Sequence, residues 1–259
     1  MKKEVAVAGT SRPRIAIWPF STPTDLRGET ADAFQGVYSR GLCKAFADGL
    51  LRTKACDVGV CLPVVDYAGL TSWVVSGAEW TQNEALAVGL PQGTDLLMFG
   101  TMRLREVVEL HCMVVAKSSA SVLLDHRLIY PREKLLDCLS DVVSLVAKTI
   151  VGRPLTLEEA QKTRLWGTHR VEAYLAYLET WSAAAAFRFG VSVPNPSGPL
   201  ECAVRAVNLD PDFAQTKAIH EALVAGRKNV DGRIPGYSEF AYPLAREAPG
   251  EKRCQDPIP

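Results

Sequence analysis

The sequence predicts an α+β protein in which a mixed-sheet α/β sandwich domain is followed by an all-α helical tail. Two apolar runs predict the sheet: RIAIWPF at 14–20 and TDLLMFGTMR at 94–103, each closed by a turn residue. Unbroken apolar runs of this length are typical of strands buried on both faces. Residues 155–227 predict the tail, because the spacing of their apolar side chains is helical. An α/β core followed by helices favours a binding module over an enzyme.

Residues 14–152 predict one layered domain with the element order β-α-β-α-β-β-β-α. Its strands are expected at 14–20, 56–65, 95–99, 108–116 and 122–130, and its long helices at 31–52 and 132–151. The short helix begins at the capping box TQNE, 81–84, in which each end residue accepts a hydrogen bond from the backbone of the other. About 140 residues in such a unit bury roughly two-thirds of the unfolded surface, so the domain is expected to be self-sufficient.

The helix at 31–52 contains three glycines, Gly36, Gly41 and Gly49. Each weakens a helix by roughly 1 kcal/mol relative to alanine. Three such residues in one helix indicate a close approach to a neighbouring element, and the sheet is the expected neighbour.

The helical tail is predicted at 155–227. It begins with a second capping box, TLEE, and its first two long helices are expected at 169–189 and 200–208. Asp210 and Pro211 are expected to be the N-cap and first residue of a third helix.

Residues 228–259 contain many Pro and Gly residues. They are expected to form an irregular C-terminal tail.

Composition excludes some classes of function. The chain has 259 residues, with 29 Lys plus Arg against 29 Asp plus Glu, and this balance argues against a nucleic-acid module held by phosphate contacts. No apolar stretch is long enough to span a membrane, and neither a signal peptide nor a lipobox is visible. The seven cysteines are odd in number and several lie in apolar runs, which predicts free thiols in the cytoplasm.

Four segments suggest a family. RIAIWPF at 14–20, GTDLLMFGTMRLR at 93–105, VEAYLAYLE at 171–179 and AVRAVNLDPDFA at 203–214 occur in this order. Together they resemble the TolB amino-terminal-domain-like module fused to a tetratricopeptide segment, as found next to bacterial nucleotidyl-cyclase or kinase signalling domains. The general fold is also similar to that of outer-membrane accessory lipoproteins. The chain departs from the pattern in its hairpin, SASVLLDHR, and in having one clear repeat.

Searches for catalytic and ligand motifs predict no enzyme, no cofactor and no metal. The sequence has no Walker loop, GxGxxG, HExxH or GxSxG. Cys56 and Cys61 favour two strand thiols over a zinc site. His111 and His126 fall on facing hairpin strands; a polar sheet face is the favoured interpretation, and a metal or proton-transfer site is the alternative.

The candidate ligand or partner surface comprises Trp18, Arg103, Arg105, Tyr174, Tyr177 and Trp181. Trp18 follows a buried strand, where core packing is favoured over a pocket wall. Arg103 and Arg105 could bind an anion, or could protect a strand edge from pairing. Trp181 is expected to attach the tail to the core or to itself.

A single helical repeat cannot cover its own apolar faces. Residues 169–227 are therefore expected to dock on the α/β domain, on another protein, or on a second copy of the chain. We predict a non-catalytic scaffold or adaptor that binds a protein partner through the tail, in a bacterial signalling or envelope-assembly complex. The alternative is a small-ligand sensor with a cleft beside residues 18–25 and 99–105.

Overall fold

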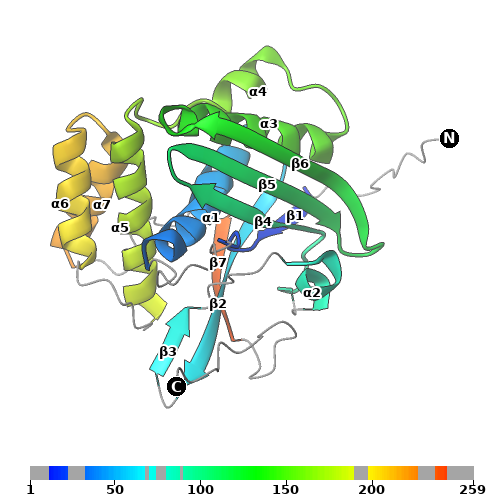
Figure 1. The fold of residues 1–259 in the computed structure, drawn as a ribbon, viewed down its shortest axis with the longest axis horizontal. Helices are drawn as coiled ribbons and strands as arrows, with labels where there is room; N and C mark the ends of the chain where they lie inside the picture. Colours follow the sequence, from blue (N-terminus) through cyan, green and yellow to red (C-terminus); the bar gives the residue numbers. More distant parts are fainter. Residues whose placement is uncertain are drawn as a thin grey trace, which may run out of the picture.

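A seven-stranded mixed sheet organises the chain (Figure 1). The computed structural model describes residues 12–22, 33–67, 70–73, 80–87, 90–189, 198–226 and 237–243. The strands are β1 (Arg14–Ile17), β2 (Asp57–Tyr67), β3 (Leu70–Trp73), β4 (Leu96–Leu104), β5 (Val107–Ala116), β6 (Ser121–Pro131) and β7 (Tyr237–Pro243). Six of them follow the order β3-β2-β1-β4-β5-β6, and β7 pairs with β2. The predicted α+β class with a mixed sheet is confirmed.

The first strand lies in the middle of the sheet, as its apolar run predicts. β1 is parallel to both neighbours, with Ile15 opposite Val58 of β2 and Leu96 of β4. Its side chains alternate between two apolar clusters: Ile15 and Ile17 belong to one, Ala16 and Trp18 to the other. A strand buried on both faces requires apolar residues at every position.

Helices cover one face of the sheet, and α2 packs on the other (Figure 1). α1 (Ala33–Thr53) and α3 (Leu135–Val151) contribute Phe46 and Leu139 to the larger cluster. α2 (Gln82–Ala87) contributes Ala85 to the smaller one, together with Phe99 of β4. The capping box predicted before α2 is present, because Thr81 and Glu84 exchange hydrogen bonds.

The glycines of α1 allow close approach to other helices rather than to the sheet. A Cβ atom on Gly41 would lie 2.7 Å from Cβ of Leu178 on α5 (Val171–Phe189). A Cβ atom on Gly49 would lie 2.5 Å from a methyl carbon of Val143 on α3. The prediction of close packing holds for these two residues, but the expected neighbour was wrong. The surroundings of Gly36 lie outside the described side chains.

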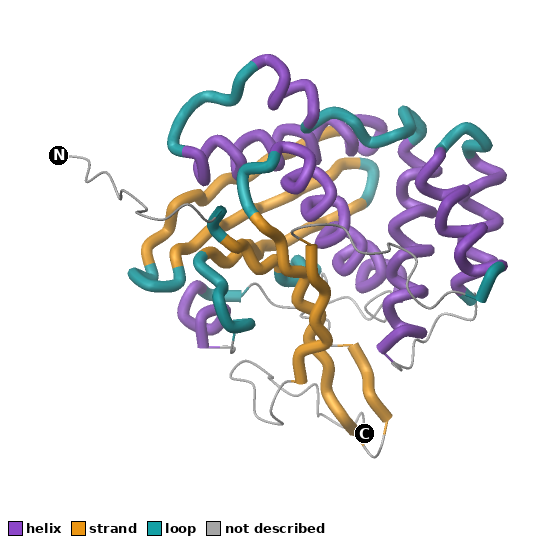
Figure 2. The backbone as a smooth tube through the Cα atoms, turned by 180° about the vertical axis from the view of Figure 1, so that it is seen from behind, coloured by secondary structure: helices purple, strands orange, loops and turns teal. Residues whose placement is uncertain are grey.

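The tail consists of α4 (Leu157–Lys162), α5, α6 (Pro199–Leu209) and α7 (Ala214–Val224). α5 packs against α1, and α6 and α7 lie beside α5 (Figures 1 and 2). Of the three docking alternatives, the structure shows docking on the α/β domain. α5 is buried continuously from Ala173 to Ser182, because it lies between α1 and the pair α6 and α7.

Two expectations for the C-terminal third were wrong. Residues 237–243, expected to be irregular, form β7, which runs parallel to β2 from Val58 opposite Tyr237 to Val64 opposite Pro243 (Figure 2). The third tail helix begins at Ala214 with Phe213 as its N-cap residue, not at Asp210 and Pro211. The rest of the predicted C-terminal tail, at 228–236 and 244–259, lies outside the described residues.

Candidate functional site

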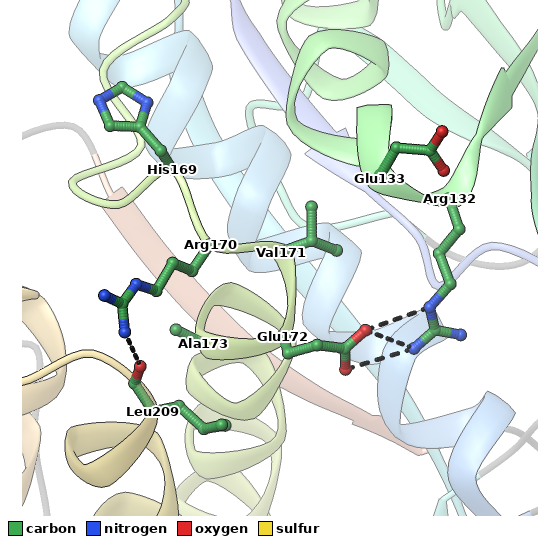
Figure 3. A pocket seen from close by; sticks show the side chains of 8 residues that line it. All are labelled: Arg132, Glu133, His169, Arg170, Val171, Glu172, Ala173 and Leu209. Atoms are coloured by element: carbon green, nitrogen blue, oxygen red, sulfur yellow. Dashed lines mark hydrogen bonds and ion pairs between the residues drawn. The ribbon is translucent and has the colours of Figure 1, made fainter.

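A cleft of about 570 Å³ lies where the α/β domain meets the tail (Figure 3). Arg132 and Glu133 come from the single 3-10 turn between β6 and α3. Arg170 immediately precedes α5, Glu172 lies in its first turn, and Leu209 ends α6. We call this the junction cleft; it is lined by Arg132, Glu133, His169, Arg170, Val171, Glu172, Ala173 and Leu209.

Two arginines that line the junction cleft each contact a neighbouring element (Figure 3). Nη2 of Arg132 lies 3.0 Å from Oε1 of Glu172 and 3.4 Å from Oε2, and Nε lies 3.2 Å from Oε1. Nη1 of Arg170 donates to the backbone carbonyl of Leu209 at 2.8 Å. The first contact joins the α/β domain to α5, and the second joins α5 to the end of α6. Both are solvent-exposed, so each contributes at most about 1 kcal/mol to stability.

A buried threonine fixes the loop that carries the cleft residues. Thr168 Oγ1 donates to Oδ2 of Asp210 at 2.5 Å and accepts from the backbone N–H of Arg170 at 3.0 Å. The hydrogen bond from Thr168 lowers the pKa of Asp210 below its usual value. Asp210 also accepts from the N–H of Asp212. This carboxylate is therefore used in holding two loops together, which explains why it does not cap α7.

The chemistry of the junction cleft suits recognition. Its charged side chains carry both signs, and the residues that line it include neither a hydroxyl nor a thiol nucleophile. Arg132 and Arg170 can each exchange their present contact for a carboxylate or backbone carbonyl of a bound segment. His169 lies apart from both arginines in Figure 3.

A second polar surface lies on the face of β4–β5–β6 that α3 does not cover. Nε2 of His111 lies 2.7 Å from Oδ1 of Asp125, and Arg103 lies 3.7 Å from Glu109. Arg103, Glu109 and His111 border a hollow of about 190 Å³. His126 is opposite Cys112, one residue out of step with His111, so its side chain lies on the other face of the sheet. The two histidines of the alternative metal or proton-transfer site are therefore not brought together.

Four of the six predicted surface residues are buried. Trp18, Tyr174, Tyr177 and Trp181 are each 4 % exposed or less. Trp18 packs against Trp80, as the core interpretation requires. Tyr174 and Tyr177 form one aromatic cluster with Phe213, and Tyr177 donates to Asp48 of α1. The expectation that these residues form a partner surface was wrong: Trp18 packs in the smaller cluster, and Tyr174, Tyr177 and Trp181 belong to the larger one, which joins the tail to the α/β domain.

The two predicted arginines remain at the surface but do not converge on one site. Arg103 lies beside Glu109, and Arg105 begins the tight turn between β4 and β5, where its N–H donates to the carbonyl of Val107. The junction cleft itself was missed. Arg132 follows the β5–β6 hairpin, and Glu172 lies in the first turn of α5. Both side chains are charged, but no sequence pattern indicates that they meet.

Within the described ranges, no group of three or more His, Cys, Asp or Glu side chains is arranged to hold a metal ion. Cys56 and Cys61 are both buried. Among the described helices, none is both long enough and apolar enough to cross a membrane.

Comparison with known proteins adds no relative. No protein-family model matches the chain, and no curated protein matches it significantly. The resemblance to a TolB-like module with a tetratricopeptide segment therefore stays a prediction.

Proposed function

We propose that the chain is a non-catalytic protein-interaction scaffold or adaptor, whose tetratricopeptide-like tail binds a protein partner. The observation that supports this is the distribution of apolar residues on the tail. Leu200 and Val204, one turn apart on α6, are 45 % and 42 % exposed, and Phe187 and Val224 are each 64 % exposed. The inner aromatic residues of the tail are already used in docking, so these outer side chains are the ones available to a partner.

The spacing of the exposed apolar residues on α6 favours recognition of a helical partner. Leu200 and Val204 have the spacing that matches the apolar stripe of a partner helix. The junction cleft adds charged groups at the end of α6, where Leu209 is also partly exposed. A bacterial signalling or envelope-assembly complex is the proposed setting, and it rests on the resemblance alone.

Affinity capture of proteins from a bacterial lysate, compared between variants, tests the proposal. The chain and its Leu200→Glu/Val204→Glu variant are compared, with Leu157→Glu as the matched control because Leu157 is 77 % exposed on α4. A protein retained by the parent and by Leu157→Glu, but lost with the double variant, supports a tail-bound partner. Equal retention by all three chains, or by none, contradicts the proposal.

A small-ligand sensor is the second candidate, favoured by one observation at the end of β1. Ser21, which bridges to Thr101 of β4, is buried, and its Oγ has no hydrogen-bond partner among the described residues. The parallel strands β2 and β4 lie on either side of β1, which is the kind of switch point where open α/β sheets bind ligands. A thermal-shift panel of small metabolites tests it: a rise of several degrees with one compound, absent in Ser21→Ala, favours sensing, and flat curves throughout count against it.

A further inference from the structure

β6 is a long strand whose outer edge faces solvent. In Figure 1 it is the outermost strand of the β4–β5–β6 meander, and the described residues place no strand beyond it. Val122 and Leu123 are 44 % and 43 % exposed, and they lie at a β-bulge, where the register between β5 and β6 shifts between Leu124 and Val122. Ile129 is 72 % exposed. From Leu124 to Pro131 the register with β5 is regular, and the open edge of this stretch is a template for pairing with another strand.

The sequence of β6 is self-complementary about His126. In an antiparallel pair of two β6 strands centred on His126, Asp125 lies opposite Arg127 of the second copy. On either side of that central group Leu124 lies opposite Leu128, so apolar residues face each other, and the regular paired stretch ends at the bulge between Leu124 and Val122. Because the arrangement is two-fold symmetric, every one of these contacts occurs twice.

The backbone of β6 directs the N–H and C=O groups that this pairing needs away from β5. The N–H of Arg132 donates to the carbonyl of Glu106 on the β5 side, so even-numbered residues of β6 direct their N–H and C=O groups toward β5. Between Leu124 and Pro131, where the register with β5 is regular, the groups of Asp125, Arg127 and Ile129 therefore point outward. In the register centred on His126, Asp125 meets Arg127, so outward groups face outward groups and both hydrogen bonds of that pair can form on each side of the axis.

Charge selects this register over its neighbours. Pairings that keep outward groups opposite each other differ by steps of two residues. The step in one direction places Asp125 opposite Asp125, and the step in the other places Arg127 opposite Arg127. Like charges directly opposite are destabilising in an antiparallel pair, whereas opposite charges stabilise it. In this register Asp125 keeps its contact with His111, whose side chain lies on the same face of the sheet, on the neighbouring strand β5.

We propose that two copies of the chain form a symmetric dimer by antiparallel pairing of their β6 strands, with His126 on the two-fold axis. The pairing joins two sheets into one continuous sheet through residues 124–128 of both copies. It also holds two tails in one assembly, so a partner with two matching segments would gain affinity from being bound twice.

Charge reversal at Asp125 and at Arg127 tests the pairing, and the combination of the two reversals is the control. The parent chain is expected to sediment as a dimer of two 28.2 kDa subunits. Asp125→Arg or Arg127→Asp alone creates two like-charge contacts and should raise the dimer dissociation constant by about tenfold or more. An equimolar mixture of the two single variants should restore the dimer, because each Arg then meets an Asp. The double variant D125R/R127D should restore it as well. Restoration shows that the single variants are folded.

Cysteine cross-linking reads the register. The test uses a Cys254→Ser background, in which the six remaining native cysteines are buried. In the proposed dimer His126 lies opposite His126 in a closely spaced, non-hydrogen-bonded pair, so His126→Cys brings two sulfur atoms together. Oxidation should therefore yield a disulfide-linked dimer. Asp125→Cys and Arg127→Cys are the matched controls, since they would cross-link only in the shifted registers. A chain that is monomeric at every concentration up to its solubility limit overturns the proposal. So does a dimer that the charge reversals leave intact, or one that cross-links best through position 125 or 127.

Discussion

Gly41 on α1 lies in direct contact with Leu178 on α5, close enough that a Cβ atom on the glycine would stand 2.7 Å from Cβ of the leucine. This contact is at the centre of the joint between the α/β domain and the tail. Beside it, the hydroxyl of Tyr177 on α5 reaches Asp48 on α1.

Gly41→Ala should destabilise the protein, although alanine favours a helix by about 1 kcal/mol relative to glycine. The added methyl meets a Cβ atom, which moves only with the backbone of α5, and overpacking of this kind costs about 1–3 kcal/mol. We expect a net loss of up to about 2 kcal/mol in the free energy of unfolding by urea. Gly198→Ala is the control, because a Cβ there has no neighbour within 4 Å. A Gly41→Ala variant more stable than the parent would show that the joint is looser than described.

Arg205→Ala should cost about 3 kcal/mol, because it removes the cationic partner of a buried carboxylate. Glu179 on α5 is 4 % exposed and forms an ion pair with Arg205 on α6. Glu179→Gln in the same background removes the uncompensated charge and should recover part of the loss. Urea denaturation of the two single variants and the double variant measures the coupling. Additive losses would mean that the two side chains do not depend on each other.

The buried thiols should be unreactive in the folded protein. Burial raises the pKa of Cys56, Cys61 and Cys138 to about 12, and raises that of Cys43 and Cys112 further. In the Cys254→Ser variant, a thiol reagent at pH 8 should therefore react only after denaturation. The unfolded chain loses thiol protons near its usual pKa of 9.0 while the folded chain keeps them, so stability should fall as the pH rises above about 9. Rapid labelling of the native variant would contradict this burial.

Glu159 should titrate far below an ordinary glutamate. Hydrogen bonds from Arg153 and from the backbone of Thr156 lower its pKa to about 2. Its contribution to the stability of α4 is therefore present above pH 4.5 and is lost as the pH falls toward 2. Carbon-detected NMR titration of the side-chain carboxyl measures the value, and Arg153→Ala should raise it toward normal. An unchanged value in that variant would show that the arginine has no influence.

Local sequence patterns predicted most elements of the α/β domain, because burial on one or two faces imposes a regular spacing on the apolar residues, but they did not predict β3 or β7. The capping boxes at Thr81 and Thr156 are present for the same reason: each depends on contacts only three residues apart. The start of α7 was mispredicted because Asp210 is bound by Thr168, more than forty residues earlier in the chain, which no local pattern reveals.

The candidate site was harder to predict than the fold. Tyr174 and Tyr177 have the composition of a recognition surface, and only the position of α1 shows that they are internal. The junction cleft depends on Arg132 meeting Glu172 at a boundary between two units whose relative placement is set by packing at Gly41. By contrast, the symmetry of β6 about His126 is visible in the sequence, but it has meaning only once β6 is known to be an edge strand.

The strand β7 also affects the order in which the protein can mature. Its partner β2 is synthesised about 180 residues earlier, as the contact of Ser238 with Val58 shows. The edge of β2 that pairs with β7 therefore stays unpaired until residue 243 has emerged from the ribosome. Non-local strand pairings of this kind form slowly. A chaperone that shields β2 in nascent chains, or a protease that removes chains ending before Tyr237, would act on this interval.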